Sequence, residues 1–322
     1  SKDYRSYLKL NEIVLEGCKV LNLAGRFNRE IERLREPYFD LFSKLGKENN
    51  SLEWWGSHIA SKNSASTPLQ LNITYLFCAK KIIDDFTNNQ KQKKLIFIAD
   101  SQALLDSIIM LGEQRNLNVF QHKQKFIKAR SLSRLFFLYI IRMAAFIFQG
   151  YNYRRLASSV SKPELSVCSE KKKTIVIRSW ITKGTLNKDG VFTDRNFGVL
   201  PDWLKSKGYK VMILPMFFNL DKSIKDMRSL ILSQNIHFII QERYLKLIDY
   251  INCIYIGFKQ INIPLKNIIL KTLDLSLLFR EIQLQQGFGT LHTYLFYPLL
   301  KRLKDLDFEV DRFYYAFENN VN

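Results

Sequence analysis

The sequence predicts an α/β protein built on a doubly wound, mostly parallel sheet, with extra helices before it. Three observations lead to this prediction. The chain has 322 residues, 47% of them hydrophobic, which is enough for a large core without disulfides or metals. From about residue 91, short apolar runs typical of buried strands alternate with segments of helical periodicity. Such alternation is typical of parallel sheets whose strands are joined by helices.

Residues 1–90 form the predicted helical N-terminal region. The pattern predicts a helix over residues 8–45, with acids and bases interleaved on its exposed face and a break at Pro37. Gly46 begins a polar loop that continues to Ser51. A second helix is expected over residues 68–86, because proline suits the first turn of a helix.

Residues 91–322 form the predicted Rossmann-like α/β domain. Helices are expected at 101–114 and 221–234, and a further one at 274–306 is expected to break near Gly287 and Gly289. Residues 158–173 are expected to form a linker. Because ligands bind beyond the carboxyl ends of parallel strands, the segments after the strands are the place to look for a site. The six strands are expected at residues 95–100, 118–122, 174–180, 210–215, 236–241 and 312–318.

A basic and aromatic helix is expected near residues 125–157 of this domain. Its centre, 132–148, is rich in Leu, Ile and Phe but carries Arg134 and Arg142, and further Lys and Arg residues flank it. It has too few consecutive apolar residues to span a bilayer, whereas an apolar face between cationic ends is typical of a helix lying in a membrane interface. The alternative is a core helix, and both interpretations hold if one face packs and the other contacts lipid.

The excess of basic residues predicts an anionic partner. The chain has 49 Lys and Arg against 30 Asp and Glu, a net charge of +19. No recognition-helix or RNA-binding pattern accompanies this charge, and the large apolar content also argues against nucleic acid. An anionic membrane surface or a phosphorylated ligand is expected instead.

No known phosphate-binding or metal-binding pattern stands in the sequence. There is no glycine-rich nucleotide motif, and the four Cys and four His lack the spacing of a metal site. We therefore predict neither a metal nor a cofactor. Reduced, buried cysteines and the lack of an apolar signal core predict a cytoplasmic protein that lies on the inner membrane.

Residues 53–63 are the first candidate for a binding site. Two adjacent tryptophans stand beside Ser, Lys and Asn side chains, and sugar rings stack their C–H faces on aromatic rings. The alternative is that the tryptophans are buried and cap the N-terminal helices. The candidate acceptor-binding residues are Trp54, Trp55, Ser61, Lys62 and Asn63.

Residues 191–204 are the second candidate, because they follow the strand expected at 174–180. A carboxylate from Asp194, with Arg195 and Asn196 beside it, can act as a general base or orient an acceptor hydroxyl. The alternative is that Asp194 or Asn196 caps a helix that follows, as is expected of Asp202.

Residues 317–320 are the third candidate, just past the last expected strand. Because parallel strands end at one edge of a sheet, Glu318 is expected to converge with Asp194 as a catalytic pair, with Asn319 beside it. The alternative is a frayed polar tail.

Taken together, these segments resemble bacterial surface carbohydrate biosynthesis proteins, a glycosyltransferase-like group related to the GT-B enzymes of lipopolysaccharide and capsule assembly. The resemblance implies a GT-B transferase with two Rossmann-like halves, the N-terminal half binding the acceptor and the C-terminal half the nucleotide sugar. It spans most of the chain and rests on Trp54-Trp55 through Ser61-Lys62-Asn63, on residues 194–204, and on Phe317-Glu318-Asn319-Asn320.

The resemblance also implies a reaction, the transfer of a sugar from a nucleotide-sugar donor to a lipid-linked glycan acceptor. The sequence departs from the group in one respect: the Glu-Asn-Asn segment is usually followed by Pro-Trp and a nucleotide-binding half, but here by Val321-Asn322. We therefore expect an acceptor-binding half that does not turn over a sugar nucleotide by itself. The alternative is a non-catalytic, membrane-associated truncated scaffold protein.

Overall fold

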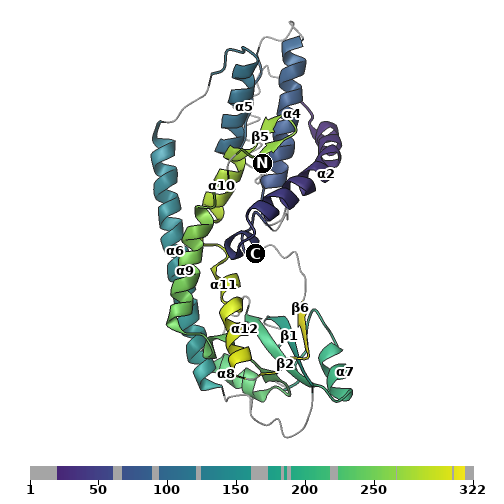
Figure 1. Ribbon diagram of the computed structural model, residues 1–322, viewed down its shortest axis with the longest axis vertical. Coiled ribbons are helices and arrows are strands. Elements are labelled where there is room, and N and C mark those ends of the chain that lie inside the picture. The colour runs from purple at the N-terminus through teal and green to yellow at the C-terminus, as the bar shows by residue number, and fades with distance from the viewer. Residues whose placement is uncertain are drawn as a thin grey trace. The chain divides into compact units, whose positions relative to one another are not determined.

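The computed structural model divides the chain into two compact units, each assembled from separate segments (Figure 1). The first unit contains Ser1–Phe136, Lys259–Gly287 and Asn320–Asn322, and the second contains Phe137–Phe258 and Phe288–Asn319. The boundary expected near residue 90 lies inside the first unit. The structure describes residues 20–60, 67–88, 94–120, 125–160, 173–182, 185–186, 190–217, 224–265, 267–306 and 308–315.

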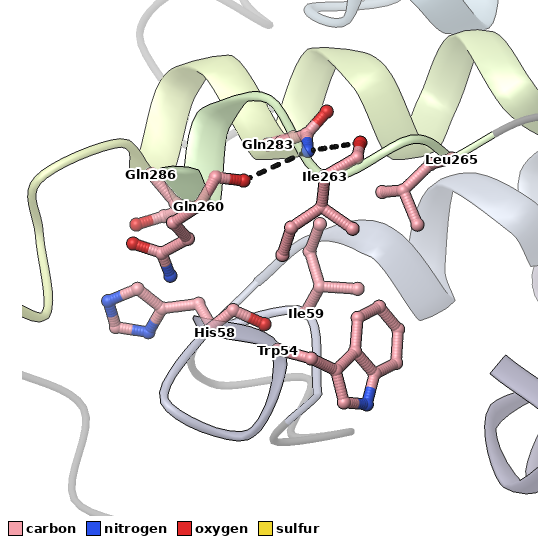
Figure 2. A pocket seen from close by; sticks show the side chains of 9 residues that line it. Trp54, His58, Ile59, Gln260, Ile263, Leu265, Gln283 and Gln286 are labelled. Atoms are coloured by element: carbon pink, nitrogen blue, oxygen red, sulfur yellow. Dashed lines mark hydrogen bonds between the residues drawn. The ribbon is translucent and has the colours of Figure 1, made fainter. Parts of the chain in front are cut away.

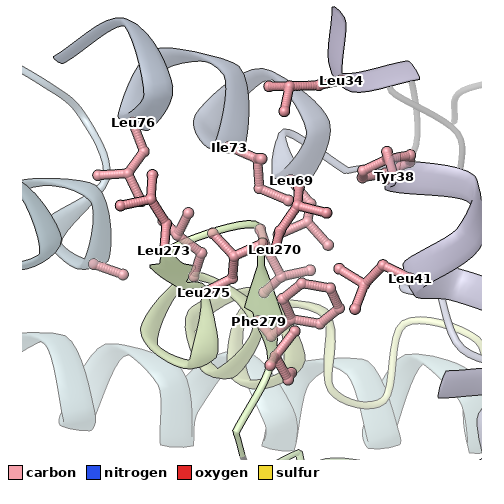
Figure 3. Packing of buried hydrophobic residues seen from close by; sticks show 14 of the residues in the cluster. Leu34, Tyr38, Leu41, Leu69, Ile73, Leu76, Leu270, Leu273, Leu275 and Phe279 are labelled. Carbon is pink, nitrogen blue, oxygen red and sulfur yellow. The ribbon is translucent and has the colours of Figure 1, made fainter. Parts of the chain in front are cut away.

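The first unit is mainly helical. Helix α4 packs against α2, α5 and α10, and the apolar side chains between them form one buried core (Figure 3). Two short strands, β4 and β5, pair antiparallel beside this core. Its described elements are α2 (Ala24–Glu48), α3 (Leu52–Trp55), α4 (Leu69–Asn88), α5 (Gln102–Gln114), β4 (Ile269–Leu270), β5 (Leu273–Asp274) and α10 (Ser276–Gln286).

Helix α2 continues through Pro37, so the break expected there is wrong. Leu34, Tyr38 and Phe42 lie at helical spacing and are all buried, and the rings of Tyr38 and Phe42 are 4.7 Å apart. A proline inside a helix removes one hydrogen bond and costs about 3 kcal/mol. Burial of this apolar face offsets that cost, since each fully buried large side chain contributes about 1.5–3 kcal/mol.

The strands expected at 95–100 and 118–122 are wrong for the described residues. Residues 94–99 and 117–120 flank α5 and belong to no strand. In the first segment Phe97 packs against the helical core, whereas Ile96 and Ile98 are exposed. One side of this segment therefore packs against the core, and no described strand pairs with it.

The second unit contains a four-stranded parallel sheet in the order β3-β2-β1-β6. These strands confirm the positions of four of the six expected ones, although β3 is much shorter than expected. From β1 the chain continues through β2 to β3 on one side, while β6 lies on the other side of β1. This reversal is compatible with a Rossmann-like fold. The strands are β1 (Thr174–Ile181), β2 (Lys210–Phe217), β3 (His237–Phe238) and β6 (Arg312–Tyr315).

Helices connect the strands of this sheet, and α12 lies next to it in Figure 1. The expected helix at 274–306 is divided at Gly287, with α10 before it and α11 and α12 after it. One face of the sheet is covered by a second apolar core, which includes Ile177 of β1 and Ile213 of β2. The connecting elements are α7 (Leu200–Ser206), α8 (Ile224–Ser233), the 3-10 turn η1 (Gln241–Arg243), α9 (Leu247–Ile261), α11 (Leu291–Tyr294) and α12 (Phe296–Asp305).

Helix α6 (Lys125–Ser159) is one continuous helix and confirms the helix expected near residues 125–157. It exposes large apolar side chains, among them Phe136, Phe137 and Phe148, each more than 60% accessible. By length and composition, Ser133–Ser159 also suffices to cross a membrane, with a mean hydropathy of 1.3 over its most apolar window. The expectation that no segment is apolar enough to span a bilayer is therefore wrong.

Candidate functional site

The strand order places a candidate site at the carboxyl ends of β1 and β6. In a doubly wound sheet, ligands bind outside the carboxyl ends of the strands, at the point where the strand order reverses. That point lies between β1 and β6, which pair in parallel from Ile175 to Arg178. The segment after β1 therefore begins at this edge.

The segment after β1 is held by contacts to the chain before β3. The backbone N–H of Asn235 donates to the carbonyl of Gly190 at 2.8 Å. Gly190 has a φ of +76°, and a Cβ there would lie 2.6 Å from the carbonyl oxygen of Ser233. Only glycine fits this close approach and this backbone conformation. The anchored loop then leads into the turn that contains Asp194.

Asp194 is 2% exposed and uses one of its two carboxylate oxygens in the fold. Its Oδ1 accepts hydrogen bonds from the backbone N–H groups of Asn196 and Phe197, at 2.8 and 2.9 Å. Its Oδ2 is buried and has no partner among the described residues. Gly198, with a φ of +54°, closes the turn through its N–H to the carbonyl of Asp194. A buried carboxylate oxygen without a donor is uncommon in a folded protein, so Asp194 is the candidate for a ligand contact in this loop.

The capping alternative for Asp194 describes part of its role. Its side chain caps the turn over residues 194–198, while α7 begins at Leu200 with no side-chain cap. Asp202 lies in the first turn of α7, where a negative charge is favourable. Arg195 and Asn196 are both exposed beside the turn.

Glu242 is a second buried carboxyl of this unit, and the sequence interpretation missed it. It follows β3 in the η1 turn, is 4% exposed, and accepts a hydrogen bond from Nε2 of Gln241 at 2.9 Å. Burial raises the pKa of Glu242 to about 7. Burial also raises the pKa of Tyr153 and Tyr250, and the nearby Glu242 carboxylate adds to both shifts. The signal for it was available, because Glu242 directly follows the strand expected at 236–241.

The end of α6 closes this edge of the sheet near Glu242. The guanidinium of Arg243 donates to the carbonyls of Ala157 and Val160 at 3.1 and 2.7 Å. The ring of Tyr153 lies 5.0 Å from that of Phe217, the last residue of β2. These contacts fix the position of Glu242, because its neighbour in the turn is tied to α6.

The paired tryptophans lie in the first unit and have different environments. Trp54 is 1% exposed, so for this residue the alternative interpretation, a buried tryptophan, is the correct one. Trp55 is 56% exposed, and its Nε1 donates to Oδ1 of Asn50 at 2.8 Å. Gly46 of α2 lies against both indole rings. Only Trp55 therefore offers an open ring face for stacking.

A small pocket lies beside Trp54 (Figure 2). Nε2 of Gln283 donates to the carbonyls of Gln260 and Ile263 at 3.0 and 2.9 Å, which ties α10 to the end of α9. The cavity volume is about 10 Å3, room for about one water molecule, so it does not admit a sugar ring. Its other lining residues are Ser57, His58, Ile59, Leu265 and Gln286.

Five predicted site residues lie outside the described part of the chain. Ser61, Lys62 and Asn63 follow the Trp54-Trp55 turn, and Glu318 and Asn319 follow β6. The convergence of Asp194 and Glu318 stays a prediction. Since β1 and β6 are parallel neighbours, the segment that carries Glu318 starts at the same sheet edge as the Asp194 loop.

The described residues contain no group of three His, Cys, Asp or Glu side chains that could hold a metal ion. Comparison with known proteins adds no assignment: no protein family, no curated protein and no solved structure matches the chain.

Proposed function

We propose that the chain is a glycosyltransferase, or the acceptor-binding half of one, in the assembly of bacterial lipopolysaccharide or capsule. The donor is a nucleotide sugar and the acceptor a lipid-linked glycan. The second unit supplies the Rossmann-like half, and Asp194, in the loop that follows β1, contacts a hydroxyl of the acceptor.

This proposal rests on the hydrogen bonding of the Asp194 carboxylate. One oxygen is fixed by two backbone N–H groups, and the other is buried without a described donor. A sugar hydroxyl is a donor of the size and polarity that such an oxygen requires. A positioned carboxylate can orient that hydroxyl and accept its proton as it attacks the donor sugar.

The surface of the chain supports a location at the inner membrane. The exposed apolar side chains of α6 include Phe137 and Phe148, with the exposed Arg154 and Arg155 one or two turns further along the helix. An apolar face next to cations binds anionic lipid surfaces. A lipid-linked acceptor is carried in such a surface, so docking brings the sheet edge to its substrate.

Binding of acceptor glycans by the Asp194→Asn variant tests the proposal. Asn keeps an oxygen for the two backbone N–H groups but removes the charge, so the fold is retained. We expect polyprenyl-linked glycans in detergent micelles to bind the wild-type chain and to bind the variant at least about tenfold more weakly, as the loss of a charged hydrogen bond predicts.

The matched control is Asp202→Asn, which changes an exposed carboxylate on α7 and should bind as the wild type does. Equal binding by Asp194→Asn and wild type would remove Asp194 from the site. A wild-type chain that binds vesicles but no glycan would instead favour the non-catalytic scaffold.

A further inference from the structure

Arg178 is a cationic side chain close to the point where the strand order reverses. In the register of the sheet it lies opposite Leu214 of β2 and Tyr315, the last residue of β6. Successive side chains of a strand point to opposite faces, and Ile177 belongs to the apolar core on one face. Arg178 therefore lies on the other face, towards α12.

Helix α12 covers Arg178 with an aromatic ring. The Cζ atom of its guanidinium lies 4.5 Å from the centre of the Phe296 ring. Phe296 also contacts Phe313 of β6, with ring centres 5.5 Å apart. This stacking fixes the plane of the guanidinium while leaving its five N–H donors at the rim of the ring.

The same face of the sheet opens towards its carboxyl edge. Val176 is buried at the centre of β1, whereas Trp180, two residues beyond Arg178, is only half-buried. On the neighbouring strands, Met216 is half-buried and Tyr315 is 60% exposed. Arg178 thus lies at the border between the covered and the open part, within reach of a ligand that enters from the edge.

Arg178 makes no hydrogen bond and no ion pair with any described residue, in contrast to the guanidinium of Arg302, which pairs with Asp249 at 2.8 Å. Burial lowers the pKa of Arg178. A guanidinium withdrawn from water without an anion is unfavourable, and a bound anion would relieve that cost.

We propose that Arg178 binds a phosphate group of a ligand that enters between the carboxyl ends of β1 and β6. The planar fork of a guanidinium matches two phosphate oxygens and binds them with two parallel hydrogen bonds. The half-buried Trp180 and the exposed Tyr315 provide ring surfaces on either side for the organic part of a phosphate ester. The choice of a phosphate over another anion rests on the proposed function, since nucleotide sugars and lipid-linked glycans both carry phosphate esters.

Calorimetric titration with inorganic pyrophosphate tests the site directly, and needs no transferase activity. We expect one pyrophosphate per wild-type chain with a Kd below about 1 mM. Arg178→Met should weaken this binding at least about tenfold, and Arg178→Lys, which keeps the charge but loses the fork, should lie between the two. Arg312→Met is the matched control, because Arg312 is an exposed cation at the amino end of β6, and it should bind as the wild type does.

Equal binding by Arg178→Met and wild type, or no binding by the wild type, overturns the proposal. If Arg178→Met does not fold, a chemical protection experiment on the wild type replaces it. Pyrophosphate should block the modification of Arg178 by phenylglyoxal, as measured by peptide mass spectrometry. Unchanged modification in the presence of pyrophosphate overturns the proposed site. Competition by CMP or UDP against a short polyprenyl phosphate then distinguishes a donor from a lipid source. If the glycan-binding experiment removes Asp194 from the site, the pyrophosphate titration of Arg178 is unaffected. The two proposals can therefore fail separately.

Discussion

At the scale of single residues, the fold surrounds two buried carboxyls of the second unit with different hydrogen-bond partners. Asp194 receives two backbone hydrogen bonds on one oxygen. Glu242 receives a single side-chain hydrogen bond, from the neutral amide of Gln241, and its burial favours the protonated form.

Replacing Glu242 by Gln should change the pH dependence of stability. The pKa of Glu242 is raised from 4.5 to about 7 in the folded chain, so the folded state holds a proton that the unfolded state has lost. Stability therefore falls as pH rises from about 4.5 to about 7, and Gln removes this loss. We expect Glu242→Gln to be more stable than wild type by roughly 3 kcal/mol at pH 8 and unchanged at pH 4.

Urea unfolding at several pH values measures this difference. Glu309→Gln, which changes an exposed carboxyl of the same unit, should leave the pH profile as it is in the wild type. A Glu242→Gln variant with the same pH slope as the wild type would show that the carboxyl is already charged in the folded chain.

At this scale the sequence predicted Asp194 and missed Glu242. Asp194 stands in a polar segment after a strand, a pattern visible in the sequence. Glu242 stands out because it is buried, in the turn whose Arg243 bonds to the carbonyls of Ala157 and Val160 at the end of α6. Those hydrogen bonds join residues 86 and 83 positions apart, which no local pattern encodes. Burial also separates Trp54 from Trp55, although the two are adjacent in sequence.

At the scale of elements, continuous apolar runs predicted β1 and β2 but also two strands that do not form. Residues 95–100 and residues 174–180 are both mainly apolar, yet only the second segment has parallel neighbours on both sides. Whether a neighbouring strand is available is a property of the whole fold. Periodicity succeeded for α4 and α5 because one face of each helix is buried in the same core.

An ion pair between α9 and α12 should contribute strongly to the second unit. Arg302 donates to Oδ1 of Asp249 and to the carbonyl of Tyr244, both at 2.8 Å, and the Asp249 side chain is 7% exposed. We expect Asp249→Ala to lower the free energy of unfolding by about 2–3 kcal/mol, somewhat below the 3–5 kcal/mol typical of fully buried pairs. The reason for the smaller cost is that Arg302 is 21% exposed.

Urea unfolding of the single variants Asp249→Ala and Arg302→Met and of the double variant measures the coupling between the two side chains. The double variant should lose less stability than the two single variants added together, because each single change leaves a charge unpaired. The exposed pair of Asp202 and Lys205 is the control, and breaking it should cost less than about 1 kcal/mol. Additive losses at Asp249 and Arg302 would mean that the pair contributes no coupling.

The exposed face of α6 should determine association with membranes. Changing both Phe136 and Phe137 to Ser removes two apolar rings that are 63% and 62% exposed. We expect the variant to remain folded and to leave the membrane fraction, because each ring contributes roughly 1.5–3 kcal/mol when it enters an apolar phase. The control changes Tyr297 and Leu306, at 64% and 53% exposure, to Ser. Equal release by both double variants would show that α6 has no special part in docking.

At the scale of the whole molecule, the sequence did not indicate how the elements are divided between the two compact units. Residues 259–287 return to the helical unit after the sheet unit has begun, and their Leu275, Leu278 and Phe279 complete the first core. Sequence order therefore does not follow the packing. A parallel strand order with a reversal at β1 could be deduced from the sequence, because the alternation of strands and helices restricts the possible topologies.

The net charge of +19 should make membrane binding depend on salt in two stages. Lys and Arg near an anionic surface contribute about 1 kcal/mol each, and salt shortens the reach of this attraction from about 10 Å at 0.1 M to about 3 Å at 1 M. Insertion of the α6 side chains is not screened in this way. We expect binding to vesicles with about 30% anionic lipid to fall at least about tenfold between 0.05 and 0.5 M NaCl, then to level off.

The plateau at high salt identifies the apolar contribution. It should persist for wild type and vanish for the Phe136→Ser, Phe137→Ser double variant, while both show the same initial decline. Neutral vesicles should bind only at the level of the plateau. Duplex DNA under the same titration should bind more weakly than anionic vesicles at every salt concentration, because the chain lacks an ordered basic pattern for a groove. Tighter binding to DNA than to vesicles would reverse the assignment of the anionic partner and, with it, the role given to α6.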